Sequence, residues 1–255
     1  MKIATWNVNG IRARGAQVLD WLASEAPDIV CLQEIKARPD QVPDTLKTLP
    51  GYQACWHGDG GYSGVALLVR RTLSATAPAC FHPPLDHDQR IVVVEIDGLT
   101  IASVYVPNGG KDLPQKLRFL EALTAWVREL HAQGRAAVIC GDLNVARADI
   151  DVHPKERRTR AIGQLPEERA LFAELLDAGL IDVARHLEPD NDALFTWWAP
   201  WRNLRQRNIG WRIDYVLVSA GLASRIEASR VQRDVGTSDH GPVIVTLRPA
   251  TSGRV

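Results

Sequence analysis

Short apolar runs rich in Val and Ile recur along the whole chain and alternate with segments of helical periodicity. β-branched residues favour strands, whereas apolar residues at three- and four-residue spacing indicate helices with one buried face. The strand-like runs are KIATW, IVCLQ, GVALLVR, IVVVEI, TIASVYV, AVIC, IDYVLV and VIVTL. This alternation restricts the chain to an α/β fold, in which helices cover a sheet.

The connections between these runs narrow the architecture further. Asp97-Gly98 separates IVVVEI from LTIASVYV, and such a dipeptide favours a tight hairpin between antiparallel strands. Helices are expected at about 17–26, between Lys111 and Gly134, and from Pro166 to Gly179. The pattern predicts a four-layer α/β sandwich: two mixed β-sheets packed face to face and flanked by helices.

The length and composition are typical of one globular domain. The chain has 255 residues, of which 45% are hydrophobic and 24% are charged. The apolar runs are far shorter than the roughly 18 residues that span a bilayer. The first residues, MKIATWNVNG, reach Trp6 and Asn7 too soon for a signal peptide. We expect a single domain over residues 1–255, a cytoplasmic location, no membrane association and a monomer.

The four cysteines lack the spacing of a metal site. Cys31 and Cys140 lie inside apolar runs, where a thiol acts as a small hydrophobic group. Cys55 and Cys80 form no CxxC pair. We therefore expect neither disulfides nor a thiolate metal site.

Charge is informative only in its distribution, because 30 basic and 30 acidic residues cancel. The segment 201–212 carries four arginines and no acid, and the segment 155–160 is also basic. Both lie in polar stretches, 145–165 and 188–212, that are longer than ordinary connections. Basic patches on a neutral protein fit a polyanionic ligand, although solvated loops explain the charge equally well.

Polar side chains stand where the strand-like runs begin or end. They are Asn7, Glu34, Tyr105, Asn108, Asp142, Asn144, Asp214, Asp239 and His240. Each alone has an ordinary interpretation as a helix cap, a turn residue or a surface residue. As a set they indicate a site, because strand ends gather at the rim of a sheet, where α/β enzymes place their chemistry.

Several carboxylates at one rim need a positive charge among them, because their mutual repulsion raises their pKa values. No Lys or Arg stands among these nine residues. A hard divalent cation such as Mg²⁺ answers this need, with phosphate completing its shell. Asp142 can then accept a proton from water, Asn144 can hold that water or a phosphate oxygen, and His240, oriented by Asp214, can donate to an oxyanion. The glycines of 57–64 lack the Lys-Ser/Thr ending of a phosphate loop.

At this point the chain resembles a known family. Six blocks resemble, in order, the signature blocks of the exonuclease III type of AP endonuclease, which belongs to the endonuclease/exonuclease/phosphatase superfamily. They are WNVNGIR, LQEIK, YVPN, GDLNVA, NIGWRIDY and SDHGPV. The resemblance runs from residue 6 to 242 and implies a two-sheet sandwich with an active site at one edge. It also implies Mg²⁺-dependent cleavage 5′ to abasic sites in double-stranded DNA, leaving a 3′-hydroxyl. Mn²⁺ would be a substitute metal, and blocked 3′ ends would be trimmed by 3′→5′ exonuclease or 3′-phosphodiesterase activity.

The resemblance also implies residue roles. Glu34 is similar to the principal metal ligand, with Asn7 and Asp239 near the metal. Asp142 is similar to the residue that orients or deprotonates the attacking water. The phosphate contacts implied in the same way are Tyr105, Asn108, Asn144 and the Asp214–His240 pair.

The tryptophans and basic residues extend the implied site. Trp211, with Trp197 or Trp198, falls where the family lines a pocket for a flipped-out abasic sugar, although core packing is the ordinary role of such residues. Arginines among these aromatics, Arg202 and Arg205, suit phosphate contacts. Lys111 stands where some relatives have an Arg that reaches into the duplex, and a Lys keeps the charge without the planar fork.

Two other functions fit parts of the sequence. A non-catalytic nucleic-acid-binding protein with this fold would be expected to have lost metal or water-positioning residues, and none is missing here. A phosphatase of the same superfamily acting on lipids or small molecules is disfavoured by the loop rich in Arg and Trp. Competition between phosphoinositides and abasic DNA would separate such a phosphatase from the DNA repair enzyme.

Overall fold

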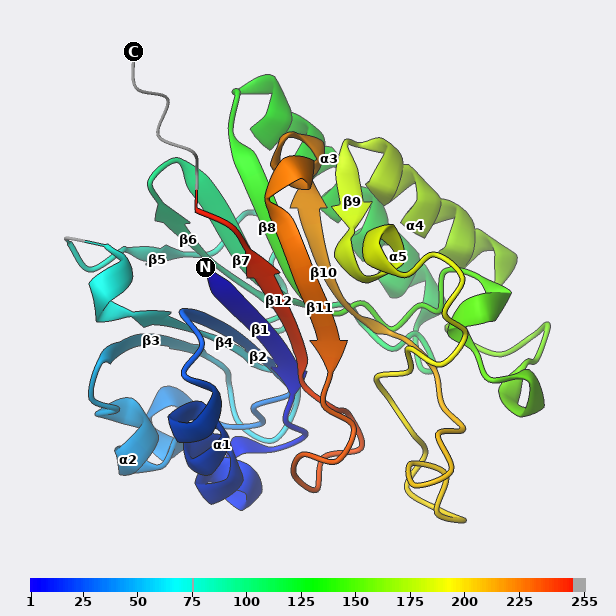
Figure 1. The fold of residues 1–255 in the computed structure, drawn as a ribbon, viewed down its shortest axis with the longest axis horizontal. Coiled ribbons are helices and arrows are strands. Elements are labelled where there is room, and N and C mark those ends of the chain that lie inside the picture. The colour runs from blue at the N-terminus through cyan, green and yellow to red at the C-terminus, as the bar shows by residue number, and fades with distance from the viewer. Residues whose placement is uncertain (75, 250–255) are drawn as a thin grey trace.

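Two six-stranded mixed sheets pack face to face, as the sequence predicts (Figure 1). The computed structural model describes residues 1–74 and 76–249. One sheet has the order β11-β12-β1-β2-β4-β3 and the other the order β5-β6-β7-β8-β10-β9. The strands are β1 (Lys2–Asn7), β2 (Ile29–Gln33), β3 (Tyr52–His57), β4 (Val65–Arg70), β5 (Cys80–Phe81), β6 (Ile91–Ile96), β7 (Leu99–Tyr105), β8 (Ala136–Asp142), β9 (Leu180–Asp182), β10 (Asp214–Ser219), β11 (Ile226–Val231) and β12 (Val243–Leu247).

Helices α1 (Ile11–Glu25), α2 (Asp44–Lys47), α3 (Leu113–Ala132) and α4 (Pro166–Asp177) cover the outer faces of the two sheets. Helix α5 (Val183–Leu187) instead contacts β10 of one sheet and β11 of the other, and its Val183 joins the core between them. Short 3₁₀ turns lie at Pro39–Gln41, Arg71–Leu73, Asp149–Asp151, Pro154–Glu156 and Ala220–Arg225. The prediction for α3 and α4 is confirmed within two residues at each end. The helix predicted at 17–26 began too late, because a glycine such as Gly15 is unfavourable inside a helix. In the structure a Cβ there would lie 3.0 Å from Pro43 Cγ, so the glycine permits close packing.

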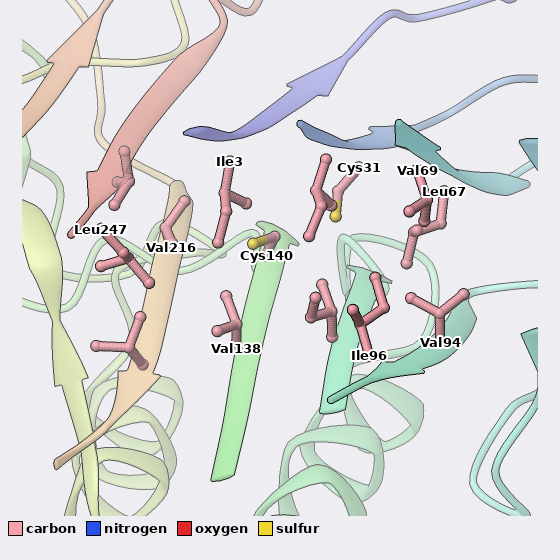
Figure 2. Packing of buried hydrophobic residues seen from close by; sticks show 14 of the residues in the cluster. Ile3, Cys31, Leu67, Val69, Val94, Ile96, Val138, Cys140, Val216 and Leu247 are labelled. Carbon is pink, nitrogen blue, oxygen red and sulfur yellow. The ribbon is translucent and has the colours of Figure 1, made fainter. Parts of the chain in front are cut away.

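The main core lies between the sheets. Figure 2 shows Ile3, Cys31, Val138 and Val216 among the side chains that fill this space. Alternate residues of the same strands face outward, where α1 packs on Trp6 and α3 and α4 pack on the second sheet. Because side chains alternate along a strand, residues two positions beyond each core residue face the same interior.

The strands that the sequence reading missed are the edge strands β3, β5, β9 and β11. Edge strands are buried on fewer sides and carry polar residues, so they lack a continuous apolar run. The hairpin between β6 and β7 is confirmed: Asp97 and Gly98 both have positive φ, 49° and 77°, as a two-residue turn of this kind requires.

One cysteine expectation is wrong. Cys55 on β3 and Cys80 on β5 form a disulfide, with Cα atoms 6.3 Å apart, that joins the edges of the two sheets. These cysteines are 25 positions apart on two strands that the sequence did not reveal, so their proximity had no sequence signal. Cys31 and Cys140 are free and fully buried, as expected.

Over the described residues, every helix is too short or too polar to cross a bilayer.

Candidate active site

The pleat of the strands brings the polar residues of the sequence motifs to one rim of the sandwich. Asn7 pairs with Gln33 in the register of β1 and β2, while Tyr105 and Asp214 both pair with Asp142 on β8. Each of these five residues lies two positions beyond an inward-facing side chain of its strand. The predicted convergence of strand ends is therefore present.

A polar layer separates this rim from the apolar core. Thr5 Oγ1 donates to Gln33 Oε1 (3.1 Å), and Gln33 Nε2 donates to Ser103 Oγ (3.1 Å). All three side chains are fully buried. Because each has a partner, the layer holds the strands of both sheets in register beneath the site.

Asn7 links the carboxylates of the two sheets. Its Nδ2 donates to Glu34 Oε1 (3.0 Å) and to Asp142 Oδ2 (2.9 Å). Tyr105 donates its hydroxyl to the same Glu34 oxygen (2.8 Å). Burial and the nearby charges of Glu34 and Asp142 raise the pKa of the Tyr105 phenol well above 10, so it remains a donor.

Glu34 follows β2 in a left-handed conformation, with φ 50°, that turns its side chain to the rim. Lys36 Nζ lies 2.6 Å from Glu34 Oε2. Burial raises the pKa of Glu34, but hydrogen bonds from Lys36 and Asn7 outweigh it and hold the pKa below 4.5. Lys36, the last residue of LQEIK, thus folds back onto the Glu34 carboxylate and brings to the rim a cation that the sequence analysis did not place there.

Asp142 ends β8 and is fully enclosed. Gly141 before it allows close contact with β7, since a Cβ there would lie 1.8 Å from the Val104 carbonyl oxygen. Asn144 donates its backbone N–H to Asp142 Oδ1 (2.9 Å). Burial first, and then the charges of Asp214 and Glu34, raise the pKa of Asp142 to about 7, although His240 opposes the shift.

His240 and Asp214 form the predicted pair. His240 Nδ1 lies 2.9 Å from Asp214 Oδ2, and Nε2 lies 3.9 Å from Asp142 Oδ2. Burial lowers the pKa of His240, but the charge and hydrogen bond of Asp214 prevail and raise it to about 10. The ring is therefore an imidazolium near neutral pH, and Nε2–H points toward the carboxylate of Asp142.

The two asparagines of the motifs lie together beside these groups. Asn108 Nδ2 donates to Asn144 Oδ1 (3.1 Å), and Asn144 Nδ2 donates to the Val106 carbonyl (3.0 Å). Beneath them, Lys116 Nζ donates to the carbonyls of Asn108 (3.1 Å) and Asn144 (2.6 Å). Sequence reasoning missed Lys116, because a Lys in a helix usually faces solvent, whereas this one is fully buried.

Lys116 is paired with a second buried residue that the sequence reading missed. Glu168 on α4 accepts from Lys116 and, through Oε2, from the backbone N–H groups of Gly163 (2.6 Å) and Leu165 (2.9 Å). The pair thus joins the loop of Asn108 to the loop after β8. A buried ion pair of this kind positions both loops.

A pocket of about 360 Å³ opens over these groups. Its lining residues are Glu34, Tyr105, Asn108, Asp142, Asn144, Ile162, Trp197, Trp211, Ile213, Asp239 and His240. Trp197 and Trp211 meet edge to face, with ring centroids 5.5 Å apart, and form an apolar wall with Ile162 and Ile213. Asp239 is held at the pocket by Trp197 Nε1 (2.9 Å) and Asn9 Nδ2 (2.9 Å).

The other residues predicted to bind substrate lie in different surroundings. Lys111 and Arg202 are exposed outside this pocket. Trp198 is 1% exposed and donates to Asn208 Oδ1 (3.1 Å), so of the FTWW pair only Trp197 lines the pocket. The Arg205 guanidinium lies over the Trp198 ring and donates to the carbonyls of Arg233, Val235 and Ser238.

Arg205 therefore has a structural role that the sequence analysis did not predict. Three carbonyl acceptors take three of its five N–H donors, which ties the loop 201–208 to the segment before β12. Charge and loop position gave the same signal for Arg202 and Arg205. Only the fold distinguishes them.

Comparison with known proteins agrees with this geometry. Residues 4–240 match the endonuclease/exonuclease/phosphatase family. An exodeoxyribonuclease of Bacillus subtilis is 36% identical over 252 residues, covering 95% of this chain and 98% of that protein. The chain belongs to the endonuclease/exonuclease/phosphatase family. Recombination repair protein 1 of Drosophila melanogaster is also 36% identical, over 253 residues, which cover 96% of this chain but only 37% of that protein.

Solved structures of this family share the whole fold. A 3′-5′ exonuclease (NExo) from Neisseria meningitidis superposes with a TM-score of 0.89 at 34% identity, covering 98% of this chain and 100% of that one. An AP endonuclease from Archaeoglobus fulgidus gives 0.86 at 29% identity, with 97% and 99% covered. The two-sheet architecture of the endonuclease/exonuclease/phosphatase family is thus the fold of this chain.

The donor set at the rim fits a divalent cation bound through oxygen. The predicted metal ligands Glu34 and Asp239 line the pocket together with Asp142. Asp142, Asp214 and His240 also have potential ligand atoms within 4.8 Å of one another, but the protonated His240 ring has no free lone pair for a metal. Asp214 Oδ1 is buried and lacks a hydrogen-bond partner among the described residues. Oxygen donors in excess of nearby positive charge are what Mg²⁺ and Mn²⁺ prefer.

Proposed function

We propose that this chain is a metal-dependent DNA repair phosphodiesterase that hydrolyses the bond 5′ to an abasic site and leaves a 3′-hydroxyl. The observation that carries the proposal is Asp142. Its carboxylate faces the pocket, is held by Asn7 and Asn144, and has a pKa of about 7. A base with a pKa near the working pH is the most effective proton acceptor for an attacking water.

The reaction divides among the groups around Asp142. Asp142 takes a proton from water as the water oxygen bonds to phosphorus and the bond to the 3′-oxygen breaks. The departing 3′-oxygen takes a proton from solvent water and becomes the 3′-hydroxyl. His240, held as an imidazolium by Asp214, donates from Nε2 to the developing phosphate charge. Tyr105 turns its hydroxyl from Glu34 to donate to a non-bridging oxygen, and the amides of Asn108 and Asn144 hold the phosphate. A bound Mg²⁺, for which Mn²⁺ is a possible substitute, supplies positive charge to the phosphate.

The proposed metal ligands are Glu34, Asn7 and Asp239. In the structure Lys36 supplies the positive charge at Glu34 (2.6 Å). Glu34→Ala should raise the metal concentration needed for the half-maximal rate, because the rim then has one ligand fewer.

The substrate class rests on the shape of the pocket. Trp197 and Trp211 form an apolar wall that suits a deoxyribose without a base, and an abasic nucleotide flips out at little cost. Blocked 3′ ends are a second candidate substrate, favoured by the resemblance to a Neisseria protein described as a 3′ phosphatase and bound to product DNA hairpin. We propose that the chain acts on double-stranded DNA as a monomer in the cytoplasm.

The deciding experiment uses a duplex with one tetrahydrofuran abasic analogue, incubated with and without EDTA. We expect a single cut 5′ to the analogue that requires Mg²⁺ or Mn²⁺. Undiminished cleavage after chelation and dialysis would remove the metal from the proposal, and cleavage of phosphoinositides in preference to this duplex would replace the DNA substrate.

A second comparison separates abasic incision from 3′ trimming. The rates on an internal abasic analogue and on an undamaged recessed 3′ end are measured for the wild type and Trp211→Ala. We expect the wild type to favour the abasic duplex and Trp211→Ala to slow that substrate more. Faster degradation of undamaged ends, with equal slowing of both substrates in the variant, would make the exonuclease activity the main one.

A further inference from the structure

A second cluster of metal-ligating side chains lies outside the pocket, where the sheet edges β3 and β5 come together. His57 ends β3, His82 follows β5, and Asp86 lies in the loop that leads to β6. Each offers a ligand atom, and these atoms lie within 4.8 Å of one another. None of the three lines the pocket around Asp142. We propose that His57, His82 and Asp86 form a separate site for a transition-metal cation of the zinc class.

The carboxylate is held in an orientation that leaves one oxygen for a ligand. Asp86 Oδ1 accepts the backbone N–H groups of Arg90 (2.8 Å) and Ile91 (2.9 Å). Its other oxygen, Oδ2, lies 2.6 Å from His57 Nε2. Carboxylates that bind metals are themselves hydrogen-bonded by outer groups, and the two backbone N–H groups give Asp86 this support while Oδ2 faces the imidazole.

His82 is oriented by Ile91, the first residue of β6. Its Nδ1 lies 3.0 Å from the Ile91 carbonyl oxygen, which can only accept, so Nδ1 carries the proton. Nε2 then keeps a free lone pair. Ile91 thus anchors both Asp86 and His82, and the strand β6 behind it is a rigid base.

The two imidazoles are already side by side. The rings of His57 and His82 stack with centroids 3.7 Å apart and planes 21° from parallel. A cation bound here would replace the proton between His57 Nε2 and Asp86 Oδ2. The His82 ring would turn out of the stack to bring its Nε2 lone pair, which lies in the ring plane, to the same cation. His82 is exposed, which gives the cation and a water ligand a path from solvent.

The donor types select the metal. Two imidazole nitrogens and one carboxylate oxygen suit Zn²⁺, Co²⁺ and Ni²⁺, which bind imidazole more strongly than Mg²⁺ does. The site also joins the two sheets, beside the Cys55–Cys80 disulfide, so a bound cation would strengthen this edge of the sandwich. This function is independent of DNA cleavage.

Co²⁺ is the probe, because its visible absorption reports the ligand set. The titration uses the full-length chain with excess Mg²⁺ to compete at the catalytic rim. We expect one equivalent of Co²⁺ to bind, Zn²⁺ to displace it, and the melting temperature to rise with Zn²⁺. Glu34→Gln should retain this equivalent. His82→Ala should weaken it at least about tenfold, the loss seen when even an outer partner of a metal ligand is removed.

His87→Ala is the matched control, because His87 lies in the same loop but outside the cluster. It should bind Co²⁺ like the wild type. His82→Ala and His87→Ala should both keep the wild-type rate on abasic DNA. The inference is overturned if wild type binds no Co²⁺ under excess Mg²⁺, or if His82→Ala and His57→Ala bind it unchanged. Binding that is lost in Cys80→Ser but kept in His82→Ala would also overturn it.

Discussion

Two groups of buried carboxylates, Asp142 with Asp214 and Asp151 with Asp182, differ in their positive partners. Asp151 and Asp182 are surrounded by arginines: Arg212 donates to Asp151 Oδ1 (2.8 Å) and to both oxygens of Asp182 (3.0 and 2.8 Å). Arg185 donates to Asp151 as well (2.7 Å). Burial raises the pKa of Asp151, but Arg212 and Arg185 outweigh it and bring the pKa below 3.8.

The carboxylates of the catalytic rim lack such compensation. Asp142 and Asp214 share one imidazolium, His240, and the pKa of Asp142 rises to about 7. Burial is similar in the two groups, so the difference comes from the partners. The arginine group stabilises the loop that carries Trp211 and the start of β10, whereas the rim is left with negative charge that a cation and a proton can neutralise.

Removing an arginine from the compensated group should have the largest effect. Arg212→Met leaves Asp151 and Asp182 buried with too little positive charge, which typically costs about 3–5 kcal/mol. Urea unfolding measures this loss. Arg128→Met, on the exposed face of α3, is the matched control and should change the free energy of unfolding by less than about 0.5 kcal/mol. Equal losses in both variants would erase the contrast between the groups.

Neutralising the uncompensated group should affect rate instead. Asp142→Asn keeps the hydrogen bond from Asn144 but cannot accept a proton, so we expect the cleavage rate on abasic DNA to fall on the order of 10²-fold or more. DNA binding, measured separately by anisotropy, should be retained. A rate within a few-fold of the wild type would reduce Asp142 to a turn residue.

The same contrast sets the pH dependence of the metal-free protein. Because the folded-state pKa of Asp142 is raised from 3.8 to about 7, its contribution to stability is full below pH 3.8 and is lost as pH rises toward 7. The raised pKa of His240, about 10 against 6.5, adds a second loss between those values. Asp142→Asn should reduce the change in the free energy of unfolding between pH 3.8 and about 7 by about 1–3 kcal/mol.

Asp151 should behave in the opposite way. Its pKa is lowered, so its contribution is present above pH 3.8 and is lost as pH falls through the folded-state value. Chemical unfolding at several pH values in EDTA measures both windows. A wild-type stability that is flat from pH 4 to 7 would contradict the assignment for Asp142.

The smallest effect concerns two arginines of one loop. Arg202 is exposed, whereas Arg205 is bound to backbone carbonyls. Arg202→Ala should reduce the log–log salt slope of DNA binding by about 0.9, the value for one lost phosphate contact. Arg205→Ala should lower the melting temperature and leave the slope unchanged. The reverse result would return Arg205 to the DNA-binding surface.

The central strands and their terminal polar residues were predictable, because apolar runs and period-two alternation are local properties of the chain. Asn7 and Asp142 stand at the ends of such runs, and Asp214 stands at the start of one. Lys36 and Lys116 were not predictable in their roles, because nothing in a sequence shows that a lysine folds back onto a carboxylate or is buried beneath two loops. Cys55 and Cys80 were missed for a related reason: their partnership depends on the meeting of two edge strands.

The alternation of side chains along β8 has a consequence for how the chain tolerates insertions and deletions. Val138, Cys140 and Asp142 share one face, so a single-residue deletion between them would turn the carboxylate toward α3 and send apolar residues into the rim. The same holds for β1, β7 and β10. In the loops 143–165 and 188–213, side chains do not alternate between two faces, so a change of one residue in length has no such effect. Homologues that differ in substrate should therefore vary in the lengths of these loops, while the number of residues from core to rim in each central strand stays constant.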